Sequence, residues 1–187
     1  MTKPFRITAA LLLSLLAFLA APLQAQQPQI PTLQVCNQTV VTGGGLVKIV
    51  SRADVGHSGT FKVEVEIKCD SSGPGYPTGV VKITSLSMSD SIVQGQINST
   101  LIEQVTSTGK HTPTAYINGR CTAQAPAGAA PIQGCRYWIM FADNKVPSAP
   151  QTADVVSFLV FDGTGKRIAY GTGPVVDGDI KVAPTGN

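Results

Sequence analysis

The most constraining feature of the sequence is a strict two-residue alternation from Phe61 to Cys69. Every odd position is apolar, and the even positions carry Lys, Glu, Glu and Lys. Successive side chains of a β-strand point to opposite faces, so this pattern predicts an antiparallel strand with one face buried and the other in water. Cys69 falls on the buried face.

Comparable β-rich runs recur along the chain, while helical periodicity is close to absent after the N-terminus. Short strands spaced by about ten residues are typical of a sandwich or a small barrel. We predict an all-β fold, a single-domain antiparallel β-sandwich of immunoglobulin-like architecture, although no Trp stands between two core cysteines. The ten expected strands are residues 33–41, 46–51, 61–69, 79–88, 92–105, 113–121, 135–141, 155–161, 166–170 and 179–182.

Glycine punctuates these runs. We expect turns at Gly43-Gly44-Gly45, at Asp162-Gly163 and at Asp177-Gly178. Gly adopts positive φ without steric cost, and Asp-Gly pairs are strong hairpin signals.

The N-terminus has the pattern of a secretory signal peptide. Lys3 and Arg6 precede an apolar run over residues 7–21, and Ala25 supplies a small residue at the expected cleavage point. An uncleaved anchor is the alternative, but the run is shorter than the roughly 20 residues that span a bilayer, so no integral membrane segment is expected after cleavage. The predicted organisation is a signal peptide at 1–25, a flexible lead-in at 26–32, the sandwich domain at 33–183 and a tail at 184–187.

Charge argues against a nucleic-acid partner. The formal net charge is +3, and loss of Lys3 and Arg6 with the signal peptide lowers it to +1. Binding to phosphate backbones requires a clustered basic surface, whereas the basic residues here are scattered.

Four cysteines in an exported chain predict disulfides, because secreted and periplasmic proteins meet an oxidising compartment. Four Cys allow three pairings, of which we favour Cys36 with Cys69 and Cys121 with Cys135. The second would close the loop 122–134, which has no core-forming residues. Zinc is a weak alternative, because the chain has no Cys-x-x-Cys pair and both His are remote in sequence from any Cys. No metal and no cofactor is expected.

Motifs for catalysis are sparse. His57 and His111 lie in turn-like stretches, and nothing pairs them with a nucleophile. Ser107-Thr108-Gly109-Lys110 matches Ser-x-x-Lys by letters only, since its Gly and the following Pro113 indicate a turn.

Paired acids also have structural explanations. Glu64 and Glu66 share a strand face but alternate with lysines, which favours a charge-balanced sheet surface over a glycosidase pair. The Asp-Gly segments lack the spaced ligands of a calcium loop. We therefore expect no catalytic residues.

The strand Cys135–Phe141 is the most aromatic in the chain and has large residues on both faces. A central strand buried on both sides is the structural explanation. The functional one is a surface platform of Arg136 and Trp138, with Tyr137 between them in sequence, because Trp, Tyr and Arg dominate binding hot spots. These three are the candidate binding residues.

The resulting hypothesis is a secreted or periplasmic, non-catalytic binding or structural module with a protein or carbohydrate partner. One alternative is a fibre subunit in which residues 26–35 add a strand to a neighbour's open sheet edge. A secreted hydrolase whose cleft is assembled from distant residues is the second alternative.

Overall fold

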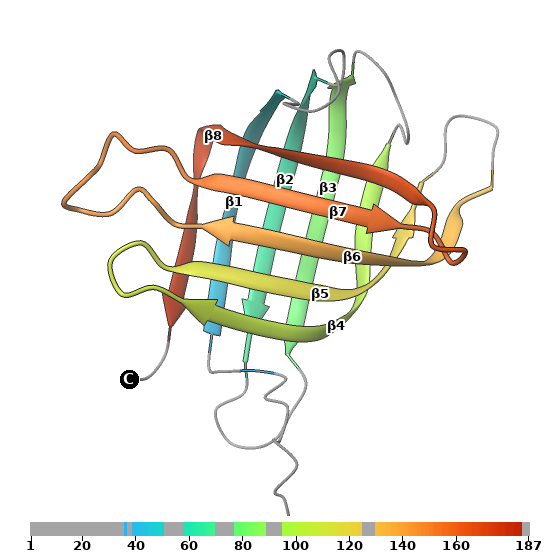
Figure 1. Ribbon diagram of the computed structural model, residues 1–187, viewed down its shortest axis with the longest axis horizontal. Coiled ribbons are helices and arrows are strands. Elements are labelled where there is room, and N and C mark those ends of the chain that lie inside the picture. Colours follow the sequence, from blue (N-terminus) through green and yellow to red (C-terminus); the bar gives the residue numbers. More distant parts are fainter. Residues whose placement is uncertain are drawn as a thin grey trace, which may run out of the picture. The chain divides into compact units, whose positions relative to one another are not determined.

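The computed structural model describes residues 36, 39–50, 58–69, 77–88, 95–124 and 130–184, all within the second of two units of the chain, Gln34–Asn187. These ranges contain strands and turns but no helix, which confirms the all-β prediction. The strands are β1 (Thr39–Val50), β2 (Ser58–Lys68), β3 (Thr78–Met88), β4 (Gln96–Thr108), β5 (Thr114–Ala123), β6 (Ile132–Ala142), β7 (Val155–Phe161) and β8 (Arg167–Pro184) (Figure 1).

The eight strands form a closed antiparallel barrel, so the predicted open β-sandwich is wrong. Each strand pairs with its sequence neighbours, and β8 pairs back onto β1 to close the ring. Alternating apolar and polar residues occur in both architectures, because each buries one face of every strand. The pairing of the first strand with the last distinguishes them, and no local pattern encodes it.

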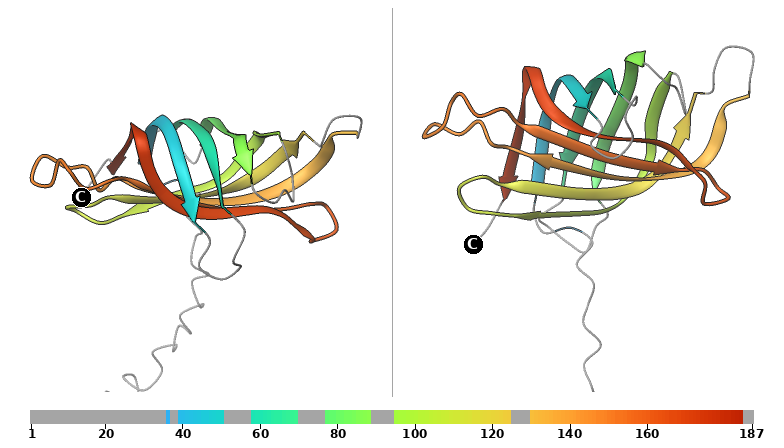
Figure 2. Two further views of the ribbon diagram at one scale, coloured as in Figure 1. Left: turned by 90° about the horizontal axis from the view of Figure 1, so that it is seen from above. Right: turned by 45° about the horizontal axis from the view of Figure 1, so that its top comes forward.

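One strand belongs to both halves of the barrel. The first part of β8 pairs with β7 as far as Val155↔Pro174, and the second part pairs with β1 from Val47↔Val175 onward. In Figures 1 and 2, β1 to β3 run across the direction of β5 to β7, and β8 turns the corner between the two sets. The runs expected as separate strands at 166–170 and 179–182 are thus parts of one strand.

Two expected turns lie inside strands. Gly43-Gly44-Gly45 is in β1 and Asp177-Gly178 is in β8, where Gly45 stands opposite Gly178. A Cβ atom on Gly178 would overlap the carbonyl oxygen of Gly44. Glycine is required here because two backbones approach closely at a barrel corner. A tight turn requires the same residue type, so the sequence pattern is the same in both cases. The Asp162-Gly163 turn between β7 and β8 is confirmed.

The core fills the barrel interior with branched aliphatic and aromatic side chains. In β2 the odd residues Phe61, Val63, Val65 and Ile67 are buried, as the alternation predicts. The rings of Phe61 and Phe158 meet edge to face at 5.2 Å, joining β2 to β7. This contact packs one strand set against the other across the interior.

Both favoured disulfides are present. Cys121 and Cys135 are cross-strand partners of β5 and β6, fully buried, with Cα atoms 4.9 Å apart. Cys36 and Cys69 have Cα atoms 5.7 Å apart, and both pack partly buried against the core. Two disulfides are compatible with an oxidising extracellular or periplasmic location.

Several sequence predictions fall outside the described residues. These are the signal peptide, the lead-in, His57 and the tail beyond residue 184. A membrane-spanning helix is not found in the part of the chain that the structure describes.

Candidate binding surface

Strand β6 separates the three candidate binding residues onto two faces. Tyr137 points into the core with 2% of its surface exposed, whereas Arg136 and Trp138 face solvent. Trp138 is 44% exposed, which is unusual for so large an apolar side chain. The expectation of a strand buried on both faces therefore does not hold for β6.

Tyr137 belongs to the barrel interior. Its hydroxyl is buried, with Ser99 and Glu103 as polar neighbours. Burial, followed by the nearby charge of Glu103, raises the pKa of the Tyr137 phenol well above its usual value. This side chain therefore stays neutral and cannot contact a ligand on the outer face.

The strand register brings other residues beside Trp138. One line across the outer face joins Gln104 of β4, Asn118 of β5, Trp138, Leu159 of β7 and Tyr170 of β8. The next line contains Tyr116, which is 49% exposed, opposite Met140. We call this outer face of β4–β7 the platform; its lining side chains are Gln104, Thr106, Tyr116, Asn118, Trp138, Met140, Ser157 and Leu159.

The platform is a shallow depression with a volume of about 220 Å³. The Asn118 amide donates to Gln104 Oε1 at 3.0 Å, which orients two amide groups along its floor. Trp138 meets Phe161 edge to face, with ring centroids 5.5 Å apart. Flat aromatic surface beside amides and hydroxyls is suited to a ligand with both apolar and hydrogen-bonding faces.

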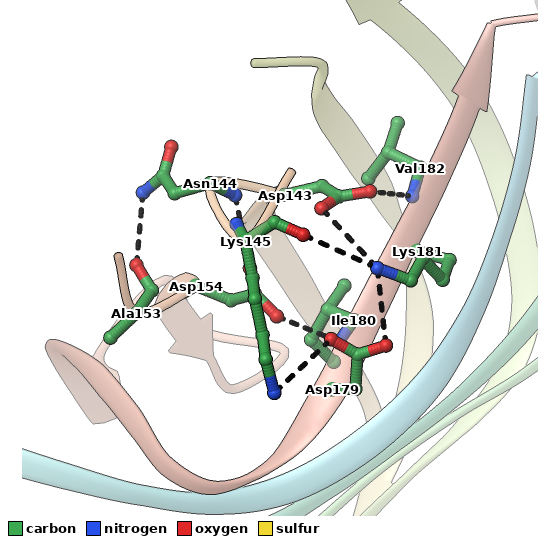
Figure 3. A network of polar contacts seen from close by, with 9 residues as sticks. All are labelled: Asp143, Asn144, Lys145, Ala153, Asp154, Asp179, Ile180, Lys181 and Val182. Atoms are coloured by element: carbon green, nitrogen blue, oxygen red, sulfur yellow. Dashed lines mark hydrogen bonds and ion pairs between the residues drawn. The ribbon is translucent and has the colours of Figure 1, made fainter. Parts of the chain in front are cut away.

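A second polar cluster lies at the corner where β8 leaves β7 (Figure 3). Asp154, just before β7, accepts the backbone N–H groups of Asn144 at 2.9 Å, Lys145 at 3.0 Å and Ile180 at 2.8 Å. Asp143 accepts the N–H of Val182 at 3.1 Å. This part of β8 pairs with β1 along one edge and no longer pairs with β7 along the other. The two carboxylates therefore accept hydrogen bonds from backbone N–H groups on the edge that lacks a partner strand.

This corner cluster has a structural role. Asp154 is 2% exposed and Asp143 is 6% exposed, so neither carboxylate faces solvent. Burial raises the pKa of Asp143 above its ordinary value, against the opposing effect of the Val182 hydrogen bond. Among the described residues, no group of three or more His, Cys, Asp or Glu is placed to hold a metal ion.

The remaining sequence candidates are at turns or on charged strand faces. His111 is exposed in the β4–β5 turn, and Ser107 shares a 2.7 Å hydrogen bond with Thr39. The Glu64 carboxylate lies 2.6 Å from Lys62 Nζ and 3.5 Å from Lys82 Nζ. The hydrogen bond from Lys62 lowers the pKa of Glu64 below its ordinary value. That contact set fits the expected charge-balanced sheet surface.

Sequence reasoning missed Tyr116, Asn118 and Gln104 as neighbours of Trp138. Tyr116 and Asn118 are two positions apart in the expected strand 113–121, so the sequence alone could have predicted that they share a face of the sheet. Their position beside Trp138 depends on the β5–β6 register, which the disulfide fixes by setting Cys121 opposite Cys135.

Comparison with known proteins adds no family: no protein-family model, no curated protein and no solved structure matches this chain.

Proposed function

We propose that the protein is an exported, non-catalytic binding module, secreted or periplasmic, that holds a glycan on the platform. The observation that supports this most is the pair of aromatic rings, Trp138 and Tyr116, about half exposed on one sheet face. Exposed aromatic side chains of this size lose little conformational entropy on binding and provide large contact areas.

The polar groups of the platform favour a sugar over an extended apolar ligand. Gln104 and Asn118 present amide groups, and the Ser157 and Thr172 hydroxyls lie 2.7 Å apart on the neighbouring strands. Sugar rings carry hydroxyls at their edges and C–H groups on their faces, so they match amides and aromatic rings respectively.

The test uses Trp138 as its own reporter, since it is the only tryptophan of the chain. The oxidised protein is titrated with a panel of soluble polysaccharides while its fluorescence is recorded. Binding on the platform shifts the emission in a saturable manner. Affinities of variants are then measured by calorimetry, which does not depend on the fluorophore.

We expect Trp138→Ala and Tyr116→Ala each to weaken binding at least about tenfold, as for other aromatic hot spots. Val176→Ala is the control, because Val176 is 58% exposed on β8 and does not line the platform. Unchanged affinity in Trp138→Ala together with a lower free energy of unfolding would assign this ring a structural role and refute the proposal.

The strand-addition alternative has one observation in its favour. β3 and β4 share only three residue pairs, Lys82↔Asn98, Ile83↔Ile97 and Thr84↔Gln96, although each strand is far longer. Unpaired strand edges are templates for an added strand. If the chain is a fibre subunit, light scattering should detect large assemblies of the undeleted chain, and deleting residues 26–35 should abolish them. An undeleted chain that stays monomeric excludes this function.

A further inference from the structure

A row of arginines crosses the outer sheet next to the platform. The register sets Arg120 of β5 opposite Arg136 of β6, Arg136 opposite Phe161 of β7, and Phe161 opposite Arg167 of β8. Neighbouring strands are about 5 Å apart, so Arg136 and Arg167 are separated by about 10 Å across Phe161. We call Arg120, Arg136 and Arg167 the arginine row.

The arginine row lies beside the line of platform residues that contains Asn118 and Trp138. Arg136 is two residues from Trp138 in β6, and Arg120 is two residues from Asn118 in β5, so each pair shares the outer face. In β8 the guanidinium of Arg167 lies 4.0 Å from the ring centroid of Tyr170. A ligand on Trp138 therefore reaches the arginines within one repeat of the strand pleat, about 7 Å.

Acidic side chains compensate this charge only in part. Arg120 Nε lies 2.8 Å from Glu103 Oε1. The Asp162 carboxylate accepts hydrogen bonds from Thr164 and Lys166 of its own turn. Arg136 is exposed and makes no hydrogen bond or ion pair with another residue that the structure describes.

Arg120 and Arg136 are directly opposed, and like charges at opposed positions destabilise a sheet. A bound anion would remove that repulsion. Guanidinium groups bind carboxylates through two parallel hydrogen bonds, which gives geometric selectivity as well as charge.

We propose that the ligand of the platform is an acidic glycan, a polymer of sugars bearing carboxylates, whose rings stack on Trp138 and Tyr116 while a carboxylate binds Arg136. This rests on the proposed glycan-binding function and adds its charge class. In a carboxylated sugar, the ring face that can stack lies within a few ångströms of the carboxylate. On the protein, the Trp138 ring and the Arg136 guanidinium are neighbours on the same face of β6 and can bind these two groups. A nucleic acid is the less favoured ligand, since a phosphate-tracking surface needs more clustered charge than three arginines partly offset by Glu103.

The experiment compares polygalacturonate with a neutral glucan and a single-stranded DNA oligonucleotide, using the oxidised protein and Trp138 emission. We expect polygalacturonate to bind tightest and its affinity to fall with added salt. Arg136→Gln should weaken polygalacturonate about tenfold, the loss of roughly one charge-assisted hydrogen bond, and leave neutral-glucan binding unchanged. Lys48→Gln, on the exposed face of β1, is the control for net charge.

Each of the other outcomes refutes either the acidic nature of the ligand or the glycan-binding function itself. Equal affinity for both glycans, unaltered by Arg136→Gln, refutes the acidic ligand and retains a glycan-binding platform. Tightest binding of the DNA refutes the acidic glycan in favour of a nucleic acid. Binding of no glycan by the wild-type protein removes the proposed function and this inference together.

Discussion

The carboxylate of Asp154 accepts the backbone N–H of Ile180 at 2.8 Å, 26 residues further along the chain. The contact joins the segment before β7 to the part of β8 that has moved away from β7. A side chain thus replaces a sheet hydrogen bond at the point where the barrel turns its corner.

Loss of the Asp154 carboxylate should be strongly destabilising. Asp154→Ala leaves the buried N–H of Ile180 and the partly buried N–H groups of Asn144 and Lys145 without their acceptor. An unsatisfied buried donor costs about 1–3 kcal/mol, and the partly buried donors add a smaller loss. We expect the free energy of unfolding in urea to fall by about 3 kcal/mol or more.

Asp177→Ala is the matched control, because Asp177 is an exposed aspartate in β8, the strand that contains Ile180. Asp154→Asn keeps one acceptor oxygen and should give an intermediate loss. An Asp154→Ala protein as stable as the control would contradict the structural role of this carboxylate.

Two aspartates should affect pH-dependent stability in opposite directions. Burial raises the pKa of Asp143 in the folded protein, so folding favours its protonated form. Its contribution is fully present below the unfolded pKa of about 4 and is lost as the pH rises through the folded value. Relative to wild type, Asp143→Asn should therefore become more stable as the pH rises from about 4 toward neutrality.

Asp162 has the opposite sign, because the Thr164 hydroxyl, followed by turn N–H groups, lowers its pKa. Its contribution is present above the unfolded pKa and is lost as the pH falls through the folded value. Urea midpoints of Asp143→Asn and Asp162→Asn, measured against wild type between about pH 3 and 7, should diverge with pH. Parallel curves would be inconsistent with these pKa directions.

Gly178 should not tolerate a side chain. Its φ is +120°, and a Cβ would overlap the Gly44 carbonyl oxygen and crowd the Cα of Gly45. We expect Gly178→Ala to lower the thermal midpoint markedly, with a cost of about 2 kcal/mol or more from strain and overpacking. Gly163→Ala is the control, since nothing lies within 4 Å of its Cβ position; equal midpoints would show that the corner relaxes.

Local patterns predicted the local parts of this structure. The alternation from Phe61 gives β2, and the Asp162-Gly163 pair gives a turn, because both depend on residues that are neighbours in sequence. The disulfide pairing was also predicted correctly, because each bond joins cysteines that are neighbours in the order of the sequence. The exposure of Trp138 shows that the interpretation of β6 as a strand buried on both faces is wrong, while a binding role of its outer face stays a prediction.

Closure of the barrel depends on pairs such as Val41↔Val182, which are remote in sequence. The glycines of β1 and β8 have the sequence pattern of turns, because the conformational freedom that permits a turn also permits close backbone approach. The roles of the corner carboxylates Asp143 and Asp154 could not be assigned either, since each accepts a backbone N–H of β8 that is 26 or more residues away.

Because β8 pairs with both β7 and β1, the barrel can close only after this last strand has been synthesised. During synthesis, β1 and β7 each wait with an unpaired edge until the last strand of the barrel arrives, because β8 alone covers both. Until then the nascent chain is an open sheet with two edges that can pair with another molecule. A chain that ends before Val175 would keep the pairing of β8 with β7 but lose its pairing with β1, and the barrel would stay open.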